Sequence, residues 1–443
     1  MAPLRLVLGA LCAAAAAAAA ARCSGQTPAW TAVTAPGVQH KVLLNDLAGP
    51  RGIVIDSEGN LLVVEQGGKG VRRVVLDDGE GLDVCVTESS QLVDDSSLSH
   101  GIALSSDGKT LFASSPTDVY AYAYDAAKGT AGAGRNIITG MDQGGHFTRS
   151  LLVPRHNPNL LLVSRGSEGN IDADTTDVGS ARSQIRTFKI DALLGDGGEA
   201  VQYASGAVLG WGLRNSVGVA EDPTTGYIWS VENSIDDMTR SGRDIHNTNP
   251  GEELNFHGLP NDTSSAVYGR NYGYPACVAI WDSDVVEGYA GGAATGKQMV
   301  GDQMPSNFTD ASCGEAVAPY VTLSAHLAPL DMEFQDDGSA AYISMHGSWN
   351  RQPPNGYRLS RLSFAAGFPV HERSSQDAEE RIMWNADDAA CPGGCFRPVG
   401  LALGGGGKRL YMTSDATGEL TAITGFRAPG TEHQATMKVQ AAC

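Results

Sequence analysis

A short apolar strand that runs into a polar Gly/Asp/Asn turn and returns as a second apolar strand occurs six times in this chain. The first three copies are evenly spaced by 49 residues. One hairpin cannot bury both of its faces, so hairpins repeated at such a period must stack against one another. The copies begin at Arg51, His100, Arg149, Asn215, Leu330 and Val399. The pattern predicts an all-β fold, a six-bladed β-propeller.

Residues 1–22 read as a secretory signal peptide, because Arg5 precedes an apolar run that ends in small residues. A retained anchor or a disordered alanine tract is the alternative, but the run is short and weakly hydrophobic for a membrane span. No other stretch of the sequence could cross a bilayer. We therefore expect a secreted chain in which residues 23–443 form a single propeller domain.

The formal net charge is −19. This charge keeps the protein soluble and argues against nucleic acid or an anionic membrane as a partner. Cationic side chains that converge in spite of it therefore indicate a specific anionic ligand.

Removal of the signal peptide leaves an odd number of cysteines, so at least one has no partner within the chain. Cys391 and Cys395 could close a tight loop, with a zinc site as the alternative for this close pair. Cys277 and Cys313 could pin a long insertion between about 233 and 327 that is rich in Gly, Asn, Asp and Ser. The remaining cysteines are Cys23, Cys85 and Cys443, and two glycosylation sequons begin in the insertion at Asn261 and Asn307.

In a propeller the first strand of each blade lines the axis. The connection that leads into this strand lies on the same face as the one that leaves the second strand, so both gather around one mouth of the axial channel. We expect the long loops on this face. The incoming connections carry Arg51, His100, His146, Arg149, Arg214, Asn215, His326 and Arg397. The outgoing connections carry Glu65, Ser114, Arg165, Glu232, Asn233, Ser234, His346, Trp349, Arg351, Ser414 and Asp415.

Arginines at equivalent positions are the first candidate site. Guanidinium groups form planar forks that suit several carboxylates or a phosphate. Their mutual repulsion is unfavourable unless a polyanion lies between them. The alternative is that each arginine pairs with a neighbouring acidic residue and braces adjacent blades. The residues concerned are Arg149, Arg214, Arg351 and Arg397.

Two histidines at the expected mouth are candidate bases. His146 follows two glycines in GGHFTRSLL, where a neutral imidazole could take a proton from a substrate hydroxyl. His346 in MHGSWNR is a second candidate base or a hydrogen-bond donor to a cofactor, with Trp349 available to stack beside it. A structural, hydrogen-bonded histidine is the alternative for each. The sequence does not rank the two.

The segment 231–238, VENSIDDM, concentrates oxygen donors in an outgoing loop, with backbone carbonyls beside Ser234, Asp236 and Asp237. Hard cations such as calcium prefer oxygen ligands from irregular backbone. An ordinary Asx turn is the alternative interpretation.

Several motifs together resemble those of the quinoprotein sugar dehydrogenases. This family of six-bladed propellers uses pyrroloquinoline quinone and calcium, and includes soluble aldose dehydrogenases, L-sorbosone dehydrogenase-like proteins and fungal pyranose dehydrogenases. The resemblance spans the mature chain. Its most specific segments are GHFTRSL, GLRNSVGVA, NYGYP, AHLAPLDMEF, MHGSWNR with PPNGY, and FRPVGLAL.

The resemblance implies roles for particular residues. His146 corresponds to the general base, the pair Arg214 and Asn215 to residues that hold the quinone, and carbonyl oxygens around 233–235 to calcium ligands. The candidate catalytic residues are His146 and His346. The candidate cofactor-binding residues are Arg51, Arg149, Arg214, Asn215, His346, Trp349, Arg351 and Arg397, and the candidate calcium ligands are Asn233, Ser234 and Ile235.

Two differences from the soluble glucose dehydrogenases indicate which branch of the family this chain resembles. Soluble glucose dehydrogenases carry a Gly-Pro turn where this chain has Asn233-Ser234, which puts the calcium ligands in doubt. They also carry two arginines in the last motif, where this chain keeps only Arg397. Both departures favour the sorbosone and pyranose branch.

The resemblance implies oxidation of a sugar hydroxyl by hydride transfer to calcium-bound pyrroloquinoline quinone. The electrons would pass to an external acceptor, a cytochrome or a quinone. One rival is a calcium-dependent propeller lactonase or other hydrolase, with Glu65, Glu232 and Asp415 as the natural metal ligands. The other is a secreted propeller that binds a ligand without catalysis.

Overall fold

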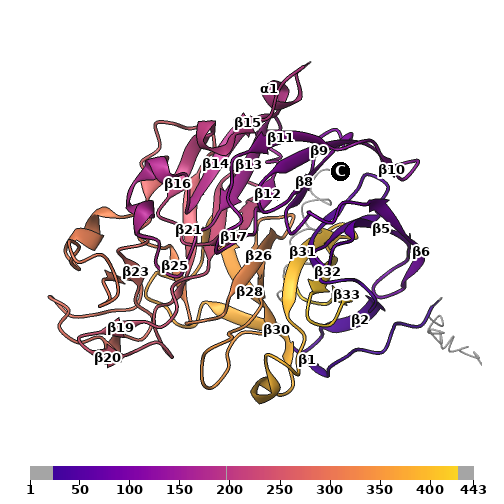
Figure 1. Ribbon diagram of the computed structural model, residues 1–443. Helices are drawn as coiled ribbons and strands as arrows, with labels where there is room; N and C mark the ends of the chain where they lie inside the picture. The colour runs from indigo at the N-terminus through magenta and orange to yellow at the C-terminus, as the bar shows by residue number, and fades with distance from the viewer. Residues whose placement is uncertain (1–22, 196, 428–443) are drawn as a thin grey trace, which may run out of the picture.

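The computed structural model describes residues 23–195 and 197–427 and shows six antiparallel sheets arranged as the blades of a ring (Figure 1). The expected signal peptide, residues 1–22, lies outside the described residues, as does Cys443. Each of the six hairpins seen in the sequence forms the two inner strands of one blade. The predicted all-β six-bladed propeller is therefore confirmed. Within the described residues, none of the helices has the length and apolar character needed to cross a membrane.

The first three blades follow the chain in order. Blade 1 consists of β3 (Pro50–Ile55), β4 (Leu61–Glu65), β5 (Gly70–Asp78) and β6 (Val84–Val93). Blade 2 consists of β7 (Ile102–Leu104), β8 (Thr110–Ser114), β9 (Val119–Asp125) and β11 (Arg135–Thr139), with β10 (Thr130–Ala131) and β15 (Val201–Gln202) at its edges. Blade 3 consists of β12 (Leu151–Leu152), β13 (Leu160–Arg165), β14 (Gln184–Lys189), β16 (Ala207–Trp211) and β22 (Arg270–Asn271), and the short helix α1 (Ile190–Leu194) follows β14.

The remaining blades complete the ring. Blade 4 consists of β17 (Ser216–Glu221), β18 (Ile228–Glu232), β21 (Glu252–Gly258) and β25 (Val321–Leu323). Blade 5 consists of β26 (Pro329–Phe334), β27 (Ala340–Met345), β28 (Arg358–Ala365) and β30 (Glu379–Asn385), with β29 (Phe368–Pro369) beside β28. Blade 6 consists of β31 (Pro398–Gly404), β32 (Arg409–Ser414) and β33 (Glu419–Thr424) and takes its outer strand from the start of the chain.

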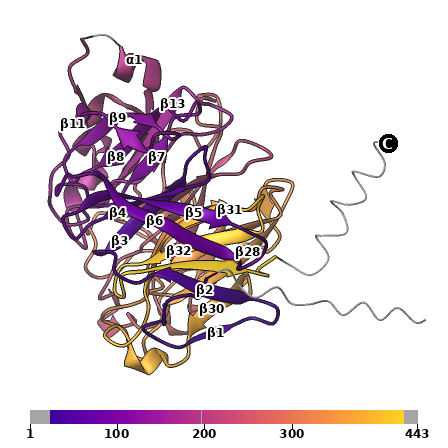
Figure 2. The same ribbon diagram turned by 90° about the vertical axis from the view of Figure 1, so that its right-hand side faces the viewer.

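The ring is closed by strands from the start of the chain. β2 (Gln39–Leu44) pairs antiparallel with β33 as the outer strand of blade 6, and β1 (Ala32–Thr34) pairs with β30 at the outer edge of blade 5. Both views show these indigo strands beside the yellow end of the chain (Figure 2). Closure of this kind pairs the outer edge of blade 6 with the amino-terminal segment and joins the last blade to the first.

Hydroxyl groups on the second strands of blades 2, 5 and 6 bond to the start of the next blade. Ser114 Oγ donates to the carbonyl of Arg149 at 2.7 Å, and Thr413 Oγ1 donates to the carbonyl of Arg51 at 2.7 Å. Ser344 makes the equivalent bond to the carbonyl of Val399. These bonds satisfy buried backbone acceptors. They also fix the backbone at two of the arginines expected at the mouth.

The core consists of apolar layers between adjacent blades. Trp229 on β18 is fully buried between blades 4 and 5, where its ring centroid lies 4.9 Å from that of Phe256 and 5.4 Å from that of Phe364. Large aromatic side chains suit this position because the gap between blades widens away from the axis.

The segment 233–327 differs from the long loops expected of it. It contains β21 and β25, the outer strands of blade 4, together with the small hairpins β19 (Thr239–Arg240) with β20 (Arg243–Asp244) and β23 (Val278–Ala279) with β24 (Gln298–Met299). β21 was missed because its sequence, EELNFHG, contains Glu and Asn, which are depleted in strands, and its polar positions are buried. Both sequon asparagines in this segment, Asn261 and Asn307, are exposed.

Six cysteines form three disulfides. The two expected pairs, Cys277–Cys313 and Cys391–Cys395, are present, so the zinc interpretation of the close pair is wrong. The third disulfide, Cys23–Cys85, ties the amino-terminal segment to β6.

Ring closure gives a testable stability prediction. Leu43 on β2 is 5% exposed and packs with apolar residues of blades 6 and 1. Replacing it with alanine should lower the free energy of unfolding by about 2–4 kcal/mol, measured by urea denaturation. Gln39→Ala, at an exposed position of the same strand, should change it by less than about 0.5 kcal/mol. If the two substitutions lowered the free energy of unfolding equally, the packing of β2 would not stabilise the closed ring.

Candidate active site

Four blades contribute to one hydrogen-bonded cluster at the mouth of the ring. Arg51 Nη1 donates to Asp415 Oδ2 at 2.7 Å, and Arg51 Nε donates to His100 Nδ1 at 3.3 Å. His346 Nε2 lies 2.9 and 3.1 Å from the two oxygens of Asp415. The structure thus brings Arg51 and His346 together as expected. It also adds Asp415, which lies next to Arg51 only because the last blade meets the first.

Arg397 belongs to the same side of the mouth. Its Nε donates to the carbonyl of His346 at 3.0 Å and its Nη2 to the carbonyl of Gly347 at 2.8 Å. The guanidinium carbon lies 5.6 Å from the ring centroid of Tyr357, which is fully buried. Arg397 therefore contacts the HGSWNR loop, residues 346–351, and its hydrogen-bond partners there are uncharged carbonyl groups.

A second cluster forms around His146. His146 Nδ1 lies 3.0 Å from the carbonyl oxygen of Ser167, as well as 3.0 Å from its hydroxyl. A carbonyl oxygen can only accept, so the Nδ1 atom carries the hydrogen and the Nε2 atom keeps its lone pair. His146 is therefore held in one tautomer, and its Nε2 atom is free to act as a base.

Arg149 holds the loop on which His146 lies. Its guanidinium group donates to the carbonyls of His146 at 2.6 Å, Thr148 at 2.8 Å and Asp142 at 2.6 Å. The side chain is 1% exposed. These contacts orient the loop and leave Arg149 little surface for a ligand.

Arg214 and Asn215 lie between blades 3 and 4. Arg214 donates to the carbonyls of Asn170 and Asn233 and approaches Asp236 Oδ2 at 3.2 Å. Asn215 accepts a hydrogen bond from Thr148 at 3.5 Å through its side-chain oxygen. The loop of the general-base candidate and the segment 233–236 therefore meet at these two residues.

The expected calcium loop presents backbone oxygens. The carbonyl of Asn233 accepts from Arg214 Nη1 at 3.1 Å, whereas those of Ser234 and Ile235 accept no hydrogen bond from any described residue. The carboxylate of Glu252 fixes the backbone of this loop. It accepts the amide of Ser234 at 2.7 Å and that of Ala328 at 3.2 Å. Two free carbonyl oxygens on a braced loop are suited to a hard cation.

Trp349 and Arg351 lie at the rim rather than inside the clusters. The side chain of Trp349 is 67% exposed. Arg351 Nε donates to the carbonyl of Asn247 at 2.5 Å, and Asn350 donates to Asp237 at 3.3 Å. The HGSWNR loop is thereby docked on the segment 237–247.

Several guanidinium groups at the mouth have no carboxylate within ion-pair distance in the described part of the chain. Arg51 and Arg214 each have one carboxylate within 4 Å, namely Asp415 and Asp236. Arg149, Arg351 and Arg397 have none among the described residues and bond to backbone carbonyls instead. Burial, with the charge of Arg165 adding to it, lowers the pKa of Arg149 to about 10. On an acidic protein, such guanidinium groups favour a bound anion.

The histidines of the mouth are held neutral. Burial, followed by the charge of Arg214, lowers the pKa of His146 to about 3. Burial lowers the pKa of His346 to about 4, with Arg397 adding to the effect, although Asp415 opposes it. Each imidazole is therefore unprotonated near neutral pH, which is the form that a general base requires. His346, however, already donates its Nε2 hydrogen to Asp415.

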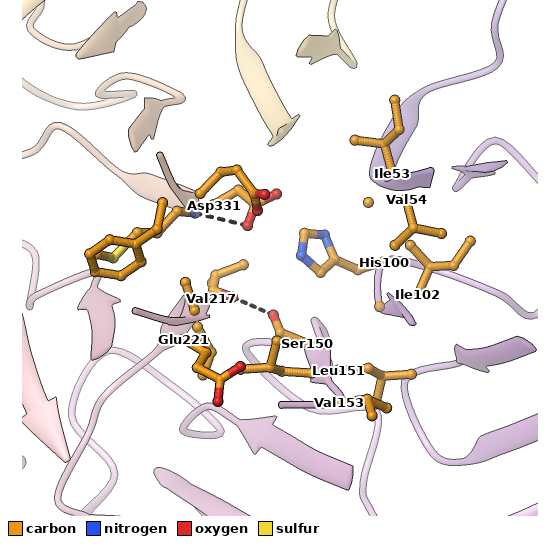
Figure 3. A pocket seen from close by; sticks show the side chains of 18 of the residues that line it. Ile53, Val54, His100, Ile102, Ser150, Leu151, Val153, Val217, Glu221 and Asp331 are labelled. Carbon is orange, nitrogen blue, oxygen red and sulfur yellow. Dashed lines mark hydrogen bonds between the residues drawn. The ribbon is translucent and has the colours of Figure 1, made fainter. Parts of the chain in front are cut away.

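The axial channel continues from the mouth as a cavity of about 170 Å³ between the inner strands. His100, Ser150 and the carboxylate of Asp331 point into it (Figure 3). Asp331 accepts the amide of Leu401 at 2.8 Å, and burial raises its pKa to about 7. The channel is narrow and carries no excess of cations, which makes the mouth the better candidate for an anion.

Two of the three carboxylates that a lactonase would use as metal ligands are otherwise engaged. Glu65 accepts from Arg72 at 2.8 Å and Asp415 from Arg51. No group of three or more His, Cys, Asp or Glu side chains within residues 23–195 and 197–427 is arranged to hold a metal ion. The geometry thus disfavours the hydrolase alternative.

Comparison with known proteins finds relatives that are named as sugar dehydrogenases. The family model described as TrAA12-like matches residues 32–425. A pyrroloquinoline quinone-dependent sugar dehydrogenase of Hypocrea jecorina is 42% identical over 394 residues, which cover 88% of each chain. A pyrroloquinoline quinone-dependent pyranose dehydrogenase of Coprinopsis cinerea is 37% identical over 91% of this chain, and the match spans 56% of that longer protein.

Solved structures agree with these relatives. The calcium structure of a Trichoderma reesei enzyme of carbohydrate-active family AA12 has a TM-score of 0.87 at 41% identity and covers 90% of this chain and 99% of that one. The holo form of the pyranose dehydrogenase quinone domain from Coprinopsis cinerea has a TM-score of 0.83 at 36% identity, covering 90% and 98%. The resemblance to quinoprotein sugar dehydrogenases is confirmed, and the chain belongs to the TrAA12-like family.

Proposed function

We propose that this protein is a secreted, pyrroloquinoline quinone-dependent dehydrogenase that oxidises a hydroxyl group of a sugar. The observation that carries the proposal is the unbalanced positive charge at the mouth. Three buried or half-buried guanidinium groups there have no carboxylate partner among the described residues. Pyrroloquinoline quinone carries three carboxylates, and relatives that are 42% and 37% identical are named as dependent on it.

The residues at the mouth fit the quinone in different ways. Arg51 and Arg397, which lie on one side of the mouth, and Arg214, which lies between blades 3 and 4, are proposed to bind its carboxylates. Asn215 and His346 are proposed to assist them. Arg351 and the exposed Trp349 are proposed to complete the site from the rim. Arg149, whose donors are engaged by the His146 loop, is proposed to position the base rather than to contact the quinone directly.

The segment 233–235 fits a calcium ion beside the quinone. The free carbonyl oxygens of Ser234 and Ile235 are proposed as ligands, and the carbonyl of Asn233 would join them if Arg214 turned toward the quinone. When bound, the quinone supplies the hydride acceptor and calcium acts on it as a Lewis acid.

His146 is proposed as the general base. Its Nε2 lone pair takes the proton of the sugar hydroxyl while the C–H bond at the same carbon breaks and a C=O bond forms, so an aldose becomes its lactone. Ser167 and Arg149 keep the imidazole and its loop in place for this step. His346 is the less suitable base because its Nε2 atom is bound to Asp415.

The route of the electrons and the location of the enzyme are also proposals. The electrons pass to an external acceptor, either a cytochrome or a quinone. Secretion is supported by the signal-like residues 1–22, by the disulfides and by the exposed sequons, because disulfides persist in oxidising compartments.

Removing the base should stop catalysis without removing the cofactor. We expect His146→Ala to lower kcat by about 10²- to 10⁴-fold and to leave the dissociation constant of the quinone within about threefold. Dye-linked turnover with an aldose and calorimetric titration with the quinone measure the two quantities. The control is His156→Ala, in the turn of the same blade at the opposite face. Unchanged turnover in His146→Ala would reassign the base.

Removing an unpaired guanidinium group should weaken the quinone specifically. Arg397→Gln is expected to raise the dissociation constant by about 10- to 100-fold, because a charge-assisted hydrogen bond contributes about 1.5–3 kcal/mol. The matched control is Arg155→Gln, whose side chain is 69% exposed on the opposite face. Equal affinity in both variants would contradict an anion site at the mouth.

The pKa of His146 should depend on the bound anion. In the quinone-free protein its imidazole should remain neutral down to about pH 4, because its pKa is lowered to about 3. A trianion among the arginines should raise this pKa, since negative charge favours the imidazolium. Loss of kcat/KM at acidic pH would then report protonation of the base. Nitrogen-15 NMR of the imidazole tests this, and titration near pH 6.5 without the quinone would contradict it.

A further inference from the structure

Blade 4 carries a row of buried polar side chains at the end that faces the mouth. Each strand contributes one residue in register, with Ser216 opposite Glu232, Glu232 opposite Glu253, and Glu253 opposite Thr322. Residues directly opposite on antiparallel strands point to the same face, so the four side chains form one row. Asn255, two positions along β21 from Glu253, points to this face as well.

These side chains are buried, and several of their atoms lack a partner. Asn255 and Thr322 are fully buried, and Ser216, Glu232 and Glu253 are at most 5% exposed. Ser216 Oγ, Glu232 Oε2, Asn255 Oδ1 and Thr322 Oγ1 make no hydrogen bond within the part of the chain that the structure describes. Leaving such atoms unsatisfied costs about 1–3 kcal/mol each. A cluster of them on one face therefore calls for a bound group.

Neither carboxylate of the row directly contacts a described cationic side chain, although the charge of Arg214 acts on Glu232 from a greater distance. Glu232 Oε1 accepts the backbone amide of Arg214 at 2.9 Å, and Glu253 Oε2 accepts the side-chain amide of Asn255 at 3.1 Å. Neither forms an ion pair with a described residue. Glu65, at the equivalent end of the second strand of blade 1, differs because Arg72 pairs with it at 2.8 Å. Like charges directly opposite each other destabilise a sheet unless something neutralises them.

The chemistry of the row matches a hard cation. Its unsatisfied atoms are all oxygens, from the carboxylate of Glu232, two hydroxyls and one amide, and the carboxylate of Glu253 lies directly opposite Glu232. Calcium takes six to eight ligands of this kind and supplies the missing positive charge. A water molecule would satisfy two to four hydrogen bonds, but it would leave both carboxylates unbalanced.

We infer that Glu232, Glu253, Asn255 and Thr322 bind a calcium ion inside blade 4. This site is separate from the loop 233–235 proposed for the calcium beside the quinone. The ion would join β18, β21 and β25 at their mouth end and so stiffen the strand from which that loop begins.

The test uses the full chain freed of metal with a chelator and without quinone, so that it does not depend on the proposed activity. Calcium chloride should raise the unfolding temperature by about 3 °C or more, and magnesium chloride at the same ionic strength should raise it less. Glu253→Gln should abolish the calcium response, and its metal-free form should unfold no earlier than the metal-free wild type. Glu65→Gln is the matched control and should retain the full response.

Thr322→Val keeps the shape of the side chain and removes one ligand. It should weaken calcium binding by about 3- to 10-fold in a calorimetric titration, and it carries the test if Glu253→Gln does not fold. A wild-type protein without a calcium response would overturn the inference. A response equal in wild type and Glu253→Gln would overturn it as well, because the ion would then lie elsewhere. An unfolding temperature that depends on pH but not on calcium would assign the row a shared proton instead.

Discussion

Guanidinium groups that bond to backbone carbonyls instead of carboxylates are the interaction on which the proposed function depends. Arg397 and Arg149 are held firmly by carbonyl oxygens, yet their charge is not cancelled. A carbonyl fixes the geometry of a guanidinium group without neutralising it, so the site remains preorganised and positive. Burial, with the charges of Arg214 and Arg149 adding to it, lowers the pKa of His146 and keeps its imidazole neutral in the quinone-free protein.

The ring makes this concentration of charge possible. Arg51, His346 and Asp415 come from blades 1, 5 and 6 and meet only because strands from the start of the chain close the circle. Hydroxyl bonds between neighbouring blades then fix the backbone at Arg51 and Arg149. The enzyme thus obtains a rigid site from loops by anchoring both ends of each loop in a blade.

The sequence predicted the parts of the structure that follow a local period. All six hairpins alternate apolar residues around a polar turn, and the rule for incoming and outgoing connections placed Arg51, His346 and Arg397 at one mouth. Strand β21 was not predicted because Glu252, Glu253 and Asn255 are polar residues that are buried within the strand. The closing strands β1 and β2 pair across hundreds of residues, and no local signal specifies that pairing. The engagement of Arg149 with its own loop likewise depends on side-chain placement that spacing alone does not give.

The most direct test of the central claim compares pyrroloquinoline quinone with its trimethyl ester, which keeps the ring system but carries no carboxylate charge. Titration of the metal-loaded, quinone-free protein with each compound measures what the charge contributes. If uncompensated guanidinium groups hold the cofactor, the ester should bind at least about 10³-fold more weakly, which corresponds to about 4 kcal/mol. Equal affinity for the two compounds would show that the arginines at the mouth serve the fold and not an anion.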